Sequence, residues 1–170
     1  MRAPITAALA LLMLFSCRQS DTVFQKKKSS HTGISFNNRI IENDSINPLD
    51  LEFLYNGGGV VAGDFNNDGL IDLYFTASTE SNKLYMNQGD FRFQDITETA
   101  GVTGESRWSN GGSAVDINND GLLDIYVSAT IRSNAADRAN LLYVNQGLNE
   151  NKIPVFREMA AEYGLADTGY

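Results

Sequence analysis

The chain has 170 residues, enough for one ordinary domain, and 13 Lys and Arg against 21 Asp and Glu give it a formal net charge of −8. This charge disfavours nucleic acid as a partner, because a surface that binds nucleic acid must neutralise phosphates. A hydrophobic fraction of 42% excludes wholesale disorder. The single cysteine excludes an intrachain disulfide framework and a cysteine-rich zinc site.

The amino terminus predicts export. An apolar run from Ile5 to Phe15 follows a short positive start, and its length fits the core of a signal peptide but not a membrane span. The run ends in Leu14-Phe15-Ser16-Cys17, which resembles the lipobox of bacterial lipoproteins. This resemblance implies that residues 1–16 are a signal peptide and that Cys17 is lipidated and anchors the protein to a membrane. The alternative is an ordinary secretory signal followed by a chance thiol.

Arg18 follows the cysteine, and by resemblance to lipoprotein sorting this favours the outer membrane, on its periplasmic or its surface-exposed face. Residues 17–33 are polar and lack a periodic apolar face, so we predict a tether. Lys26-Lys27-Lys28 either contacts anionic lipid headgroups or is a solvated part of this tether. His31, the only histidine, is expected to be solvated.

The rest of the chain contains two copies of one unit. Asp64–Asp72 (DFNNDGLID) returns 52 positions later (116 − 64) as Asp116–Asp124 (DINNDGLLD). Two further blocks also return: NKLYMNQG from Asn82 as NLLYVNQG from Asn140, and FQDITETAGV from Phe93 as FREMAAEYGL from Phe156. We predict a first unit over residues 34–107 and a second over 108–170, where the chain ends at the start of a third, as in an amino-terminal fragment.

The distance between matching residues of the two copies increases along the chain, so the second copy has insertions, at Ile131–Ala139 and Leu148–Lys152. We expect these insertions to be surface loops that either provide partner specificity or are neutral.

The repeated blocks predict short strands and one helical turn in each unit. Three or four short strands in about 50 residues are typical of a propeller blade, and closed propellers need roughly four to eight blades. The fold is therefore predicted to be all-β, with β-propeller blades that form an incomplete propeller. The predicted strands are Asp72–Thr76, Lys83–Met86, Phe91–Phe93, Asp124–Ser128, Leu141–Val144 and Val155–Phe156, and the helical turns are Thr97–Ala100 and Ala160–Tyr163.

The nine-residue block D-x-N-x-D-G-x-x-D predicts a calcium site in each unit. Calcium takes six to eight oxygen ligands, and alternate residues of a tight loop can direct oxygens to one centre. Side chains at positions 1, 3, 5 and 9 and the carbonyl at position 7 would provide these oxygens, while glycine at position 6 permits the turn. The predicted ligands of the two Ca²⁺ ions are Asp64, Asn66, Asp68, Leu70 and Asp72, and Asp116, Asn118, Asp120, Leu122 and Asp124.

These loops are not EF-hands. An EF-hand requires a bidentate Glu at position 12, where this chain has Phe75 or Val127. The remaining alternative is a β-turn with stray acidic residues. Two copies with every oxygen-bearing position filled favour metal binding over that alternative.

The stretch Tyr55–Gly63 running into the first loop, followed by DLYF, NKLYMNQG and FQDIT, resembles the FG-GAP/VCBS repeat proteins, in particular the group related to cartilage acidic protein and the ASPIC/UnbV proteins. The resemblance implies a calcium-bearing β-propeller, similar to the integrin α-chain head, in an exported protein. Family members usually have Asp at loop position 3, whereas this chain has Asn66 and Asn118, which lowers the charge of the ligand set.

No Ser-His-Asp or Cys-His arrangement and no phosphate-binding glycine loop can be assembled from the sequence. Trp108 is predicted to pack within a blade, the alternative being a ligand platform. We therefore expect a non-enzymatic, envelope-anchored module that binds a protein or glycan. The alternative is an accessory or amino-terminal part of a larger exported enzyme whose catalytic residues lie downstream.

Overall fold

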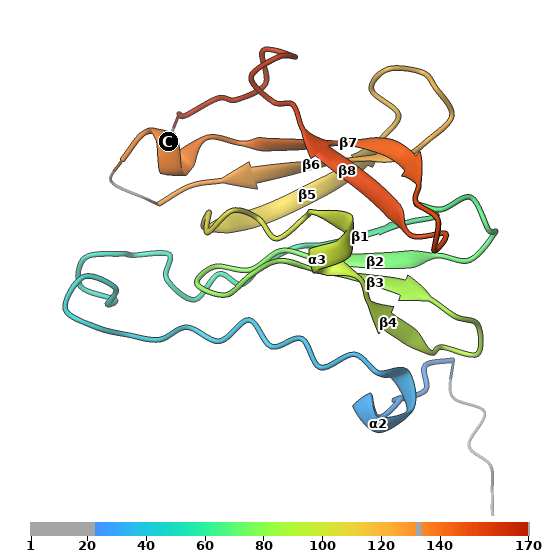
Figure 1. The fold of residues 1–170 in the computed structure, drawn as a ribbon. Coiled ribbons are helices and arrows are strands. Elements are labelled where there is room, and N and C mark those ends of the chain that lie inside the picture. Colours follow the sequence, from blue (N-terminus) through green and yellow to red (C-terminus); the bar gives the residue numbers. More distant parts are fainter. Residues whose placement is uncertain (1–22, 132–133, 170) are drawn as a thin grey trace, which may run out of the picture.

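The computed structural model describes residues 23–131 and 134–169 and contains two four-stranded antiparallel sheets (Figure 1). The predicted signal peptide and Cys17 lie outside the described residues. One sheet falls within each predicted repeat unit, and no closed propeller is formed by the described residues. The predicted all-β fold, with one four-stranded sheet in each unit, is thereby confirmed.

Each sheet is a meander in which strands that follow one another in sequence are neighbours in space. The first sheet comprises β1 (Val60–Gly63), β2 (Asp72–Phe75), β3 (Lys83–Asn87) and β4 (Phe93–Asp95). The second sheet comprises β5 (Ser109–Val115), β6 (Asp124–Ala129), β7 (Leu141–Leu148) and β8 (Pro154–Glu158).

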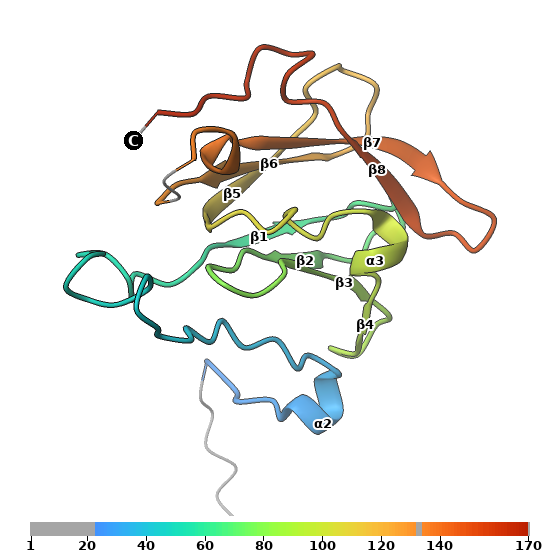
Figure 2. The same cartoon turned by 60° about the vertical axis from the view of Figure 1, so that its left-hand side comes forward.

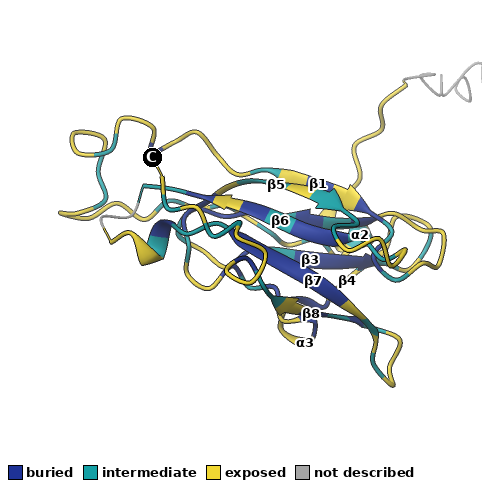
Figure 3. Cartoon of the chain, turned by 90° about the horizontal axis from the view of Figure 1, so that it is seen from above, coloured by how far each residue is buried: buried dark blue, intermediate teal, exposed yellow. Residues whose placement is uncertain are grey.

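The main core lies between the two sheets, which stack as layers in Figures 1 and 2. Tyr74 and Leu84 of the first sheet and Ile125 and Val127 of the second belong to this core and are fully buried. Seen from above, the buried stretches concentrate in β3, β6 and β7 (Figure 3). Trp108 is only 2% exposed, which confirms its predicted packing role.

Among the described residues, three short helices accompany the sheets: α2 (Ser29–Thr32), α3 (Thr97–Ala100) and the 3-10 helix η2 (Ala136–Arg138). The predicted turn at Thr97–Ala100 is confirmed. The equivalent segment Ala160–Tyr163 also forms a single turn, in which Tyr163 N donates to Met159 O at 3.1 Å with the i→i−4 spacing of a helix, but it does not continue as a helix. No helix of residues 23–131 and 134–169 is long and apolar enough to cross a membrane.

The segment predicted as a tether contains structure at its carboxyl end. Helix α2 ends at Gly33, and His31 Nε2 lies 3.0 Å from the carbonyl oxygen of Asp90, so this exposed histidine has a protein partner. Beyond Gly33 the chain runs beneath the first sheet in both views (Figures 1 and 2). There Phe36 stacks on Phe75 with ring centroids 5.0 Å apart.

The second predicted insertion forms strand as well as loop. Leu148 ends β7 and pairs with Pro154 of β8 across a register shift, so the extra residues extend the β7–β8 hairpin. The equivalent strand β3 ends at Asn87, and its hairpin is shorter. An extended hairpin satisfies more backbone groups than a loop of equal length would.

Candidate functional site

The two acidic loops lie side by side at corresponding positions of the two sheets. The first connects β1 to β2 and the second connects β5 to β6. Asn67 of the first loop donates a side-chain hydrogen bond to the carbonyl of Gly121 in the second, at 3.3 Å. The structure therefore brings both sets of predicted ligands to one region of the molecule.

The backbone of each loop passes twice through the left-handed region. Asn67 and Asn119 at position 4 have φ of 57° and 59°, and Gly69 and Gly121 at position 6 both have φ of 85°. Asparagine and glycine are the residues that adopt these angles at least cost. The repeated Asn-Asp-Gly therefore fixes one and the same turn in both units.

The carboxylates at positions 1 and 5 bind the amides of their own loop. Asp64 accepts hydrogen bonds from the amides of Asp68 and Gly69 at 3.0 and 2.8 Å, and Asp116 accepts the matching pair at 3.0 and 2.9 Å. At position 5, Asp68 accepts from the amide of Leu70 and Asp120 from that of Leu122, both at 2.8 Å. The carboxylates at positions 1 and 5 therefore make the same hydrogen bonds in both loops. The side chains at position 3 close the same network: Asn66 and Asn118 donate to Asp68 and Asp120 at 2.9 and 2.8 Å.

The carboxylate at position 9 is buried at the start of the next strand. Asp72 is 1% exposed and accepts hydrogen bonds from the amides of Phe65 and Asn87. Asp124 is fully buried and accepts from the amides of Ile117 and Asn145. Each of these aspartates begins a strand and joins the loop before it to the next strand, β3 for Asp72 and β7 for Asp124.

Burial raises the pKa of Asp72 to about 6, with the nearby Asp68 and Asp64 adding to the effect and its two backbone hydrogen bonds opposing it. The pKa of Asp124 is raised for the same reasons, desolvation first. Among the described residues, no Lys, Arg or His forms an ion pair with any of the six loop aspartates. The loop carboxylates are therefore not neutralised by a direct ion pair within the part of the chain that the structure describes.

Within residues 23–131 and 134–169, no three Asp, Glu, His or Cys side chains converge in a group that could hold a metal ion. The carboxylates at positions 1 and 5 instead accept hydrogen bonds from backbone amides of the same loop. Their donor set consists of oxygen atoms alone, which is the chemistry that hard divalent cations prefer. Calcium binding by these ten residues stays a prediction.

Two pairs of asparagines recur in the two sheets, one pair beside the acidic loops and one at the opposite ends of the strands, and neither pair was singled out from the sequence. Asn145 donates to the carbonyls of Leu123 and Phe65, and its equivalent Asn87 donates to that of Ile71. Asn82 and Asn140 donate to the hydroxyls of Tyr74 and Tyr126, both at 2.8 Å. All four asparagines occur at matching positions of NKLYMNQG and NLLYVNQG, and this repetition is the sequence signal that could have identified them.

A cleft of about 480 Å³ opens beside the first loop. Asn66 and Asp68 of the loop line one part of it, and Leu148, Asn151 and Lys152 of the extended β7–β8 hairpin line another. One of the two insertions of the second unit thus lies next to the predicted metal ligands of the first. The other insertion includes η2. It also includes residues 132–133, which lie outside the described part of the chain.

Residues 64–127 match the family model of the FG-GAP-like repeat. The matched stretch begins at the first residue of the first acidic loop, includes the whole second loop and ends within β6. Together with the two four-stranded meanders, this match supports an FG-GAP/VCBS repeat protein. The FG-GAP repeat suggests a binding module of the β-propeller type.

Proposed function

We propose that this chain is a calcium-stabilised, envelope-anchored FG-GAP module that binds a protein or glycan without catalysing a reaction. The observation that carries the proposal is the pair of acidic loops with the same turn, the same hydrogen bonds and, among the described residues, carboxylates without an ion pair. Chance turns with stray acidic residues would not be expected to agree in all three respects.

The residues fit a calcium ion by their chemistry. Asp64, Asp68 and Asp72 would hold one ion with the side chain of Asn66 and the carbonyl of Leu70, and the equivalent five residues of the second loop would hold the other. A bound divalent ion would supply positive charge next to the buried carboxylate of Asp72 or Asp124. Its role would be to fix the loop against the strand that follows it.

A role in binding, and not in catalysis, agrees with the residues around the loops. The described residues offer no histidine near the loops, since His31 bonds to Asp90 in the β3–β4 hairpin. The cleft beside the first loop is lined by amide, carboxylate and ammonium groups from two different units. Such groups recognise the hydroxyls of a glycan or the backbone of a protein.

The membrane anchor belongs to the same proposal and depends on Cys17. A single acyl chain gives only marginal membrane binding, so stable attachment requires more than one chain on this residue. The outer membrane is the proposed destination, because Arg18 follows the cysteine.

Isothermal titration of the chain with CaCl₂ tests the central part of the proposal. We expect two ions per chain and one ion for either Asp68→Asn or Asp120→Asn, which remove a charge with little change of shape. Asp95→Asn, which changes an aspartate of β4 outside both loops, is the matched control and should still bind two ions. Absence of any calcium-dependent heat in the unmodified chain would contradict the proposal.

A further inference from the structure

Two segments meet at the end of the sheets that lies opposite the acidic loops. Residues 40–58 lead into the start of β1, whose end leads into the first acidic loop. Residues 130–131 follow the end of β6, whose start is the last residue of the second acidic loop. Figures 1 and 2 show both segments at the same end of the sheets. The surface that they form is therefore separate from the candidate calcium sites.

This surface exposes four large apolar side chains from one short stretch of chain. They are between 53% and 94% exposed and belong to Ile41, Leu49, Phe53 and Tyr55. Phe53 also lines a groove of about 370 Å³, together with Leu51 and with Thr130 and Ile131 of the other segment. We call the four side chains and this groove the apolar loop surface. Exposed apolar clusters with a polar rim are typical of protein-binding sites.

The first segment holds these side chains in a defined conformation. Leu54, which lies between the exposed Phe53 and Tyr55, is only 1% exposed and fixes the segment to the body of the protein. Further back, Asn47 Oδ1 accepts hydrogen bonds from the amides of Leu49 and Asp50, at 3.0 and 3.1 Å. A surface that is ordered before binding loses less conformational entropy when a partner binds.

The other segment contributes a strained residue to the groove. Ile131 has φ of 68°, in the left-handed region that β-branched residues rarely adopt. Such a conformation costs free energy, and strain of this kind is concentrated at binding and catalytic sites. The backbone of Ile131 is thus a second observation that points to this groove, independent of the exposed apolar side chains.

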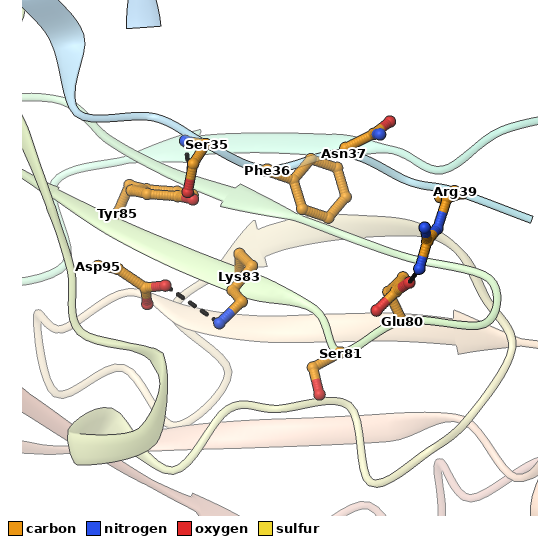
Figure 4. A pocket seen from close by; sticks show the side chains of 9 residues that line it. All are labelled: Ser35, Phe36, Asn37, Arg39, Glu80, Ser81, Lys83, Tyr85 and Asp95. Carbon is orange, nitrogen blue, oxygen red and sulfur yellow. Dashed lines mark hydrogen bonds and ion pairs between the residues drawn. The ribbon is translucent and has the colours of Figure 1, made fainter. Parts of the chain in front are cut away.

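The charge of the apolar loop surface has one sign. Residues 40–58 contain no Lys or Arg, and none of their four exposed carboxylates forms an ion pair with a described residue: Glu42, Asp44, Asp50 and Glu52. The groove on the outer face of the first sheet differs, because there Lys83 pairs with Asp95 at 3.1 Å and Arg39 with Glu80 at 3.7 Å (Figure 4). A partner of the apolar loop surface is therefore expected to carry positive charge.

We propose that the apolar loop surface binds a protein segment in which apolar side chains alternate with Lys or Arg. Apolar side chains of this segment would fill the groove beside Phe53 and Ile131, and its cations would lie next to the unpaired carboxylates. A second copy of this chain and an anionic membrane are both disfavoured, because they would bring negative charge to an acidic surface. The inference rests on the proposed binding role and names its partner, but it does not depend on calcium or on the anchor.

Titration with a synthetic peptide tests the class of partner. The probe is a peptide of about 18 leucine and lysine residues, and its control has glutamate in place of each lysine. We expect the lysine peptide to bind the full chain about tenfold more tightly than the glutamate peptide, and to bind less tightly when NaCl is raised from about 50 to about 500 mM. Equal binding of the two peptides, or no binding of either, would overturn the proposal.

Matched variants test whether the peptide binds at this surface. Phe53→Ser should weaken binding of the lysine peptide about tenfold, whereas Phe91→Ser, at a phenylalanine with 63% exposure against 64%, should not. Glu52→Gln should weaken it about threefold, and Glu98→Gln, which removes the same charge from α3, should change it less than about 1.5-fold. Equal effects within either pair would mean that the peptide binds without a site, which would overturn the proposal.

Sedimentation velocity tests the alternative partner. We expect the chain alone to be a monomer, and a dimer that Phe53→Ser dissociates would assign the surface to a second copy and overturn the proposal. The calcium titration is a separate measurement with different variants. A chain that binds calcium but not the lysine peptide would therefore refute this inference alone, and a chain that binds only the peptide would refute the calcium proposal alone.

Discussion

Asn145 in β7 of the second sheet donates a hydrogen bond of 2.9 Å to the carbonyl of Phe65 in the acidic loop of the first. The bond is buried and joins residues 80 positions apart in sequence. Phe65 in turn donates its amide to Asp72. The second sheet thus supports the loop of the first, so the two units are coupled through the candidate site as well as through their core.

Replacement of this asparagine should cost more stability than replacement of its equivalent. Asn145→Ala leaves the buried carbonyl of Phe65 without a partner, and we expect a loss of about 1–3 kcal/mol in the free energy of unfolding. Asn87→Ala is the matched control, since its side chain bonds to the carbonyl of Ile71 in its own unit and should cost about 0.5–1.5 kcal/mol. Urea denaturation measures both losses, and equal values would show that the link between the units adds nothing.

The loop glycines should be sensitive to a single methyl group. Gly69→Ala and Gly121→Ala place a Cβ in open space, but at φ of 85°, where an L residue is strained by about 1–2 kcal/mol. Gly111→Ala in β5 is the control, because its Cβ would meet only the Ser128 hydroxyl, at 3.5 Å, and its φ is not positive. Thermal unfolding should show a loss in both loop variants and little change in the control. Unchanged stability in the loop variants would mean that the positive φ is not required.

Membrane attachment should depend on Cys17. Cys17→Ser removes the thiol that would be acylated, so the protein should leave the membrane fraction and lose incorporation of a labelled fatty acid. Ser16→Ala keeps a small residue before the cysteine and should remain attached and labelled. A Cys17→Ser protein that still fractionates with membranes and still takes up label would rule out the anchor.

The extended β7–β8 hairpin should contribute to ligand specificity. Removal of the extra residues within Leu148–Lys152 shortens the hairpin toward the length of β3–β4 and opens the cleft beside the first loop. We expect the trimmed chain to keep its melting temperature within about 5 °C and to lose ligands that the intact chain retains on a glycan array. Identical array profiles for the two proteins would make this insertion a neutral one.

The sequence predicted the structure best where both copies form the same tight turn. Asn67-Asp68-Gly69 and its repeat predicted the turns, because the required φ values restrict the residue types. Position 9 was predicted as a metal ligand, whereas its burial and its two amide partners arise from strand packing that no local pattern contains. Asn145 could not have been distinguished from Asn87, since only tertiary structure places one of them against the other unit.

The segment before residue 34 was missed for a different reason. This segment has few apolar residues, and Lys26-Lys27-Lys28 made it resemble a solvated linker. The helical turn α2, the positive φ of Gly33 and the bond from Ser35 to Tyr85 relate it to residues 97–104, and these are features of the three-dimensional structure. Ala160–Tyr163 was predicted as one helical turn because its sequence aligns with α3. It forms a single turn that does not continue as a helix, since so short a segment depends more on its surroundings than on propensity.

Thermal unfolding with and without a calcium chelator tests the central claim most directly. At a free calcium concentration 100 times Kd, each site adds about 2.7 kcal/mol to the free energy of unfolding, which corresponds to roughly 5–10 °C in a chain of this size. We predict that chelator lowers the melting temperature of the unmodified chain by at least this amount and leaves the double variant Asp68→Asn, Asp120→Asn unchanged. A melting curve of the unmodified chain that is the same in calcium and in chelator would contradict the account and leave the two acidic loops as structural turns.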